Sequence, residues 1–84
     1  MTVRRIRVAL HARAADLAGA SQTAVDVPES ATGRDVKRAL GALHPGLLGL
    51  LASAALATDH EYLSDGAAVG DDSSLHLVPP VSGG

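Results

Sequence analysis

The residues best suited to chemistry stand at the end of the sequence, which reads Pro79-Pro80-Val81-Ser82-Gly83-Gly84. A free α-carboxyl group has a pKa of about 3.5, so the terminal carboxylate of Gly84 is ionised at neutral pH. Gly83 and Gly84 have no side chains, so this end can enter a narrow channel and a bulky nucleotide can approach the carboxylate. A carboxylate is a poor acylating agent because its leaving group would be oxide. The ending therefore predicts an acyl donor that another protein must activate.

The residues before the glycine pair are suited to positioning it. Pro79 and Pro80 fix φ and stiffen the base of the segment, which lowers the entropy lost when it inserts into a partner. Six extended residues reach at most about 20 Å. We expect an N-terminal domain over residues 1–78 and an extended tail over residues 79–84. The partner-binding residues that we predict are Val78, Pro79, Pro80, Val81 and Ser82, with the chemistry at Gly84 and access provided by Gly83.

Other polar residues give weaker signals. The four histidines, His11, His44, His60 and His76, are spread along the chain without the spacing of metal ligands, so we read each as a separate surface or loop residue and predict no metal site. Three basic residues, Arg34, Lys37 and Arg38, suit the solvent face of a helix.

Composition narrows the class of protein. The 84 residues form one domain, and a net charge of −2 argues against nucleic acid as a partner. The longest apolar stretch, from Leu47 to Leu56, is well short of the ~20 residues that a membrane span needs. We therefore expect a cytoplasmic protein that binds neither nucleic acid nor membrane. Without cysteine, and with Tyr62 as the only aromatic residue, the core must consist of aliphatic side chains.

The first third of the chain has the pattern of two strands. Residues 3–10 alternate, with Ile6, Val8 and Leu10 on one face, which is the period of a half-buried strand. Residues 23–27 repeat the pattern until Pro28, which cannot donate to a ladder. Residues 11–20 fit either a short helical turn or a loop anchored by Leu17.

The clearest helix begins at Thr32, which is followed by Asp35 in a capping-box arrangement. Its apolar face is predicted to be Val36, Leu40 and Leu43, and His44-Pro45 should end it. Leu47, Leu48, Leu50 and Leu51 are expected to cover the bottom of the core as a short helical segment. Strand patterns return at residues 55–58, 61–63 and 75–78. This order predicts an α+β roll with a mixed four- to five-stranded sheet packed on one main helix.

The element order and the Pro-Pro-Val-Ser-Gly-Gly ending resemble the MoaD/ThiS family of ubiquitin-like sulfur carriers, most closely the small subunit of molybdopterin synthase. The resemblance extends over nearly the whole chain and implies a β-grasp fold. The sequence departs from the family at Gly33, where an apolar residue is usual, which should weaken the helix somewhat.

The resemblance implies a carrier or co-substrate rather than a catalyst alone, and allows for the non-catalytic subunit of a sulfurtransferase. An E1-like adenylyltransferase would use ATP and Mg²⁺ to adenylate Gly84, and a persulfide donor would convert it to a thiocarboxylate. The large subunit of molybdopterin synthase would then receive the sulfur for molybdenum cofactor biosynthesis. The chain itself would bind no cofactor, and its lack of cysteine fits sulfur carried on Gly84.

Three alternatives stay open at this point. The chain could carry sulfur for thiamin, cysteine or a thio-containing secondary metabolite. It could be a ubiquitin-like protein modifier, joined to lysines of other proteins through Gly84. It could also be a binding module whose tail does no chemistry.

Overall fold

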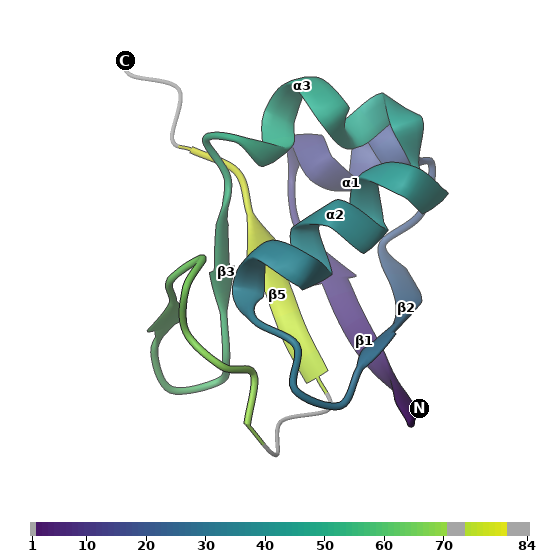
Figure 1. The fold of residues 1–84 in the computed structure, drawn as a ribbon. Coiled ribbons are helices and arrows are strands. Elements are labelled where there is room, and N and C mark those ends of the chain that lie inside the picture. The colour runs from purple at the N-terminus through teal and green to yellow at the C-terminus, as the bar shows by residue number, and fades with distance from the viewer. Residues whose placement is uncertain (1, 71–73, 81–84) are drawn as a thin grey trace.

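The computed structural model describes residues 2–70 and 74–80. Five strands, β1 (Val3–Leu10), β2 (Gln22–Pro28), β3 (Ala55–Ala57), β4 (Tyr62–Leu63) and β5 (Ser74–Val78), form one sheet in the order β2-β1-β5-β3-β4. β1 and β5 are parallel, and the other pairs are antiparallel. The helices α1 (Arg13–Ala18), α2 (Gly33–Leu43) and α3 (Leu48–Leu51) lie on one side of this sheet (Figure 1). The predicted α+β roll with a mixed sheet is confirmed.

Alternation decides which side of each strand faces the helices. Ile6 and Val8 in β1 and Leu75 and Leu77 in β5 are almost completely buried, whereas Arg5 and Arg7 are exposed. Arg5 binds Asp26 of the neighbouring strand β2 at 3.2 Å, which raises the pKa of the guanidinium through that hydrogen bond. Arg4 donates to the carbonyl oxygen of Gly70 and so ties the start of β1 to the loop before β5.

The main helix α2 starts and stops where the sequence predicts. The carboxylate of Asp35 accepts the backbone N–H of Thr32 at 3.0 Å and its hydroxyl at 3.2 Å, which holds the pKa of Asp35 below its ordinary value. Val36 and Leu40 are fully buried, as predicted. The prediction for Leu43 is wrong, because 54% of this residue is exposed. It lines an open surface hollow with Ala24 and Asp26 of the edge strand β2. The last turn of α2 therefore lies at the border of the core, where this side chain reaches solvent.

The short helices correct two further expectations. Residues 13–18 form α1 rather than a loop, but Leu17 is 40% exposed and Ala14 is the residue that packs into the core. After α2, a 3₁₀ turn, η1 (Pro45–Leu47), leads directly into α3. Leu47, Leu50 and Leu51 are buried as predicted, whereas Leu48 is 62% exposed. In elements this short only one side meets the core, and hydrophobicity alone does not identify that side.

Gly33 has a steric reason to lack a side chain. The first turn of α2 packs on the loop before β5, with the N–H of Gly33 bonded to the carbonyl oxygen of Ala67 at 3.0 Å. A Cβ atom on Gly33 would stand 2.6 Å from the backbone oxygen of Ser64. Glycine therefore allows a close backbone approach here, which offsets its low helix propensity.

Gly33→Ala should lower the free energy of unfolding by about 1–3 kcal/mol, because the loop at Ser64 must move to admit the methyl group. Gly49→Ala in α3 is the matched control, since a Cβ there would meet nothing within 4 Å. The control should be neutral or gain up to about 1 kcal/mol. Urea unfolding of both variants measures the difference, and equal stabilities would contradict this explanation of Gly33.

Candidate functional site at the base of the C-terminal segment

The C-terminal segment leaves the sheet from an interior strand. β5 is hydrogen-bonded to β1 on one side and to β3 on the other, with Val78 opposite Ala55. Pro79, which is half-buried, and Pro80, which is exposed, come directly after β5. Val81, Ser82, Gly83 and Gly84 lie outside the described residues, so their predicted roles stay predictions. The base of the C-terminal segment is therefore held by hydrogen bonds to strands on both sides.

A surface hollow of about 570 Å³ lies beside this base. The residues that line it come from the end of β1, from β3 and β4 with their connecting turn, and from β5. They are His11, Ala57, Thr58, Asp59, His60, Glu61, Tyr62, His76 and Val78. Tyr62 is 74% exposed, which is unusual for the only aromatic residue of a chain. The hollow therefore combines polar groups, one aromatic ring and apolar surface beside the start of the segment.

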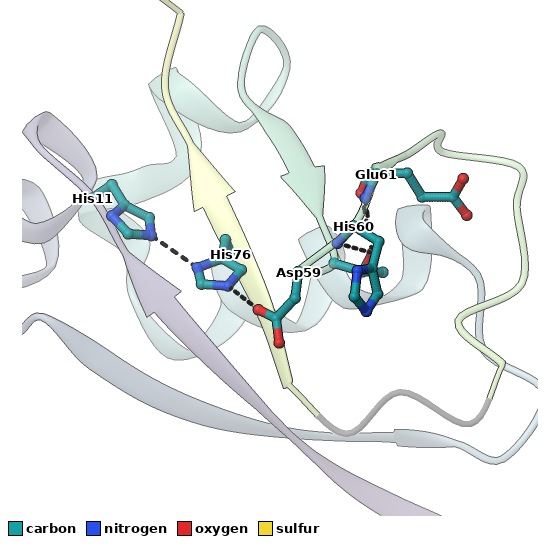
Figure 2. Close-up of polar contacts among 6 residues, drawn as sticks. His11, Asp59, His60, Glu61 and His76 are labelled. Carbon is teal, nitrogen blue, oxygen red and sulfur yellow. Dashed lines mark hydrogen bonds and ion pairs between the residues drawn. The ribbon is translucent and has the colours of Figure 1, made fainter.

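Three of these residues form a hydrogen-bonded chain (Figure 2). His11 Nε2 and His76 Nδ1 are 2.9 Å apart, and His76 Nε2 lies 2.9 Å from Asp59 Oδ1. The two ring centres are 5.2 Å apart, with an angle of 27° between the ring planes. An ionised Asp59 can only accept, so a neutral His76 donates to it from Nε2 and accepts from His11 at Nδ1. Each side chain thereby fixes the orientation of the next.

The local structure explains how residues so far apart in sequence meet. His76 alternates with the buried Leu75 and Leu77, so it projects from the sheet face that the helices leave open. Ala57 of β3 is its partner in the pairing register, which places the following turn beside it. In that turn the hydroxyl of Thr58 accepts the backbone N–H groups of His60 and Glu61, each at 3.1 Å. This geometry aims Asp59 at His76.

The sequence interpretation of the histidines is therefore incomplete. Their spacing predicts separate surface residues, whereas the structure brings His11 and His76 together with Asp59. His44 also has a partner, because its Nε2 lies 2.8 Å from the hydroxyl of Thr23. Alternation along residues 75–78 does place His76 on the open sheet face, and this is the available signal. Its contacts depend on pairing with segments that no local pattern identifies.

Asp59 stays ionised to lower pH than an ordinary aspartate. The hydrogen bond from His76 contributes most to lowering the pKa of Asp59, and the Coulomb interaction with His76 comes next. Burial opposes both effects, and His60 adds a smaller lowering. The carboxylate is 73% exposed, so it remains open to a ligand while His76 holds it. A fixed, ionised and accessible carboxylate is suited to recognising a cation.

The pKa of Asp59 should lie below the usual value of about 3.9. An NMR titration that monitors the chemical shift of its carboxyl carbon measures it. Because the folded-state pKa is lowered, the pairing contributes stability above about pH 4 and loses it as the pH falls through the folded value. His76→Val removes the donor and should raise the pKa of Asp59 toward its usual value. An unchanged titration in that variant would show that His76 is not the cause.

Of the three basic residues predicted on the solvent face of α2, Arg34 and Arg38 are exposed, as predicted. Lys37 is predicted on the solvent face of α2, but its side chain is 14% exposed and binds Asp65 at 3.0 Å. Within residues 2–70 and 74–80, no group of three or more histidine, aspartate or glutamate side chains is arranged to hold a metal ion. None of the helices in this part of the chain is long and apolar enough to cross a membrane.

Comparison with known proteins agrees with the architecture. The mixed five-stranded sheet on one main helix is a ubiquitin-like β-grasp fold, as two crystal structures show. SAMP1 from Haloferax volcanii superposes with a TM-score of 0.82 and 31% sequence identity, covering 96% of this chain and 100% of that one. A crystal structure of H. volcanii small archaeal modifier protein 1 matches with a TM-score of 0.80 and 29% identity, covering 92% of this chain and 98% of that one.

Sequence comparison identifies the family. The model of the ThiS family matches residues 8–84. The molybdopterin synthase sulfur carrier subunit of Arabidopsis thaliana is 33% identical over 79 residues, which cover 94% of this chain and 82% of that protein. The chain belongs to the ThiS family of ubiquitin-like sulfur carriers, and the predicted family and fold are both confirmed.

Proposed function

We propose that this chain carries sulfur as a thiocarboxylate on Gly84 and serves as the small subunit of molybdopterin synthase. The observation that carries this proposal is the family match, which runs through the fold and on to Gly84. The likeness to the Arabidopsis thaliana molybdopterin synthase sulfur carrier subunit over 94% of the chain supports the pathway. The position of Pro79 and Pro80 directly after an interior strand supports a segment presented from a rigid base.

The proposed chemistry takes place in partners. In the active site of an E1-like adenylyltransferase, the Gly84 carboxylate attacks the α-phosphorus of Mg²⁺-bound ATP and pyrophosphate leaves. The terminal sulfur of a persulfide then attacks the acyl carbon and AMP leaves. A thiol cleaves the resulting sulfur–sulfur bond and is itself oxidised to a disulfide, which leaves the thiocarboxylate. The contribution of this chain is to present the acyl group, with Gly83 giving access and residues 78–82 making the contacts.

The thiocarboxylate would then deliver its sulfur within the complex with the large subunit of molybdopterin synthase. This step needs no thiol from the carrier, consistent with a sequence that contains no cysteine. Sulfur transfer to a thiamin, cysteine or secondary-metabolite precursor would use the same terminal chemistry with a different acceptor. The acceptor enzyme, rather than this chain, sets that choice.

Reconstitution tests the proposal. The chain is incubated with an E1-like adenylyltransferase, ATP, Mg²⁺ and a persulfide donor, and its intact mass is measured. We expect the increase that corresponds to replacement of one oxygen by sulfur, and no change when ATP is omitted. Addition of the large subunit and its pterin substrate should return the mass to its starting value. A chain that stays unmodified with its own activating enzyme would overturn the proposal.

A protein modifier is the second candidate, and the match to small archaeal modifier protein 1 at a TM-score of 0.80 favours it specifically. In that case Gly84 would form isopeptide bonds with lysines. Adding cell extract to the same reconstitution separates the two functions. Only a modifier would yield branched peptides, in which the C-terminal residues of this chain are joined to a lysine of another protein.

A further inference from the structure

We propose that the hollow beside β5 is the docking surface for the adenylating partner, and that the partner fills it with an arginine or lysine side chain. The inference rests on the proposed function and adds to it the residues that select the partner. The cation would bind the carboxylate of Asp59 and lie against the ring of Tyr62. His76 and His11 would hold that carboxylate in place.

Charge is the first argument. Among the described residues, the lining of this hollow includes Asp59 and Glu61 but neither lysine nor arginine. A second hollow of about 330 Å³, on the helix side, has the opposite character, because Arg34, Lys37 and Arg38 line it. Three histidines also line the first hollow, Arg7 lines the adjoining one with Asp59, and Asp65 lines the second. With two carboxylates and no lysine or arginine in its own lining, the hollow next to the C-terminal segment is still the better suited of the two to a basic side chain of a partner.

Preorganisation is the second argument. Asp59 Oδ1 already accepts a hydrogen bond from His76, which in turn is held by His11. An ionised carboxylate has about four acceptor positions, so a guanidinium or ammonium group can bind without displacing His76. Because the carboxylate is fixed before the partner arrives, little side-chain entropy is lost when they meet.

Tyr62 is the third argument. Its side chain is largely exposed in the two-residue strand β4, where the core does not need it. A cation that binds a tyrosine face gains about 0.5–1 kcal/mol at exposed sites and more when water is excluded. Tyrosine is also enriched among the residues that dominate binding energy at interfaces. Tyr62 and Asp59 line the same hollow, so one basic side chain could contact both.

The position of the hollow next to the C-terminal segment indicates that its partner is the adenylating enzyme. Val78 lines the hollow, and the next residue, Pro79, starts the segment that ends at Gly84. A protein seated in the hollow therefore lies against the base of the segment that it must take up. Docking there would act on the ground state and the transition state alike, so its loss should raise KM and leave kcat nearly unchanged.

Kinetics of pyrophosphate release by an E1-like adenylyltransferase test the proposal. Asp59→Arg and Tyr62→Ala should each raise KM for the carrier by about tenfold, which corresponds to about 1.4 kcal/mol, with kcat within about twofold. The matched controls are Glu29→Arg, an exposed acid outside the hollow, and Leu48→Ala, an exposed apolar residue on the helix side. Both should keep the wild-type KM, and melting temperatures should show that all four variants fold.

Salt provides an independent readout. The wild-type KM should rise with ionic strength, and Asp59→Asn should flatten that rise because it removes the charge and keeps the shape.

If the wild type is active and the variants match their controls, docking is elsewhere and only this inference fails. If sedimentation shows that the two variants lose self-association instead, the hollow binds a second copy of the chain. A wild type that releases no pyrophosphate would refute the proposed function itself.

Discussion

Deletion of Gly83 and Gly84 should abolish thiocarboxylate formation and leave the melting temperature almost unchanged. Without these residues the chain ends at Ser82, so the carboxylate lies two residues short of its proposed position and beside a side chain. The buried core of the described residues extends no further than Leu77, so we expect the fold to be independent of the glycine pair. Intact-mass analysis after reconstitution and thermal unfolding by circular dichroism measure the two effects.

Gly84→Ala is the matched control for this deletion. It keeps the length of the chain and its terminal carboxylate but adds a Cβ beside the reacting carbon. Thiocarboxylate should still form, more slowly than in the wild type. Persistent modification of the shortened chain would contradict the proposed role of the glycine pair. So would a fall of about 5 °C in its melting temperature, which corresponds to roughly 1 kcal/mol, because the glycine pair would then be part of the folded structure.

Leu40→Ala should have the largest effect on stability. Leu40, on the core-facing side of α2, is fully buried. Truncation of a buried leucine to alanine costs about 2–5 kcal/mol in lost burial and cavity formation. That is a large share of the roughly 5–15 kcal/mol typical of whole domains, and the sequence has no cysteine with which a disulfide could support this small core. Urea unfolding at neutral pH measures the loss.

Leu43→Ala, three residues along the same helix, is the control for Leu40→Ala. Since 54% of Leu43 is exposed, its truncation should change the free energy of unfolding by no more than about 0.5 kcal/mol. The two substitutions remove the same atoms from the same helix, so only burial differs between them. Similar losses from both would mean that Leu43 is covered in solution.

This pair of leucines shows what the sequence can predict about the fold and where it stops. The helical period correctly places Val36 and Leu40 in the core, and the capping residue Thr32 locates the start of α2. The same period places Leu43 on the same face, but the period carries no information about how far the sheet extends beneath the helix. At its last turn α2 meets the edge strand β2. There, a side chain on the core-facing side of the helix still reaches solvent.

The site is only partly predictable for a related reason. Val78, Pro79 and Pro80 stand at a sequence ending whose composition alone indicates function. The chain of His11, His76 and Asp59 has no such local pattern, because it forms through the parallel pairing of β1 with β5 and the return of β3 along β5. Strand registers are set by the whole core, so neighbours separated by 65 positions cannot be read from the spacing of residues.

Tandem mass spectrometry of the C-terminal peptide, taken from protein purified from its own cells, would show whether Gly84 is the sulfur-bearing residue. We expect a chain that ends at Gly84, with a fraction of molecules carrying sulfur in place of oxygen on its terminal carboxyl group. A natural chain that continues past Gly84 without being trimmed, or sulfur found on any other residue, would contradict the proposed carrier function.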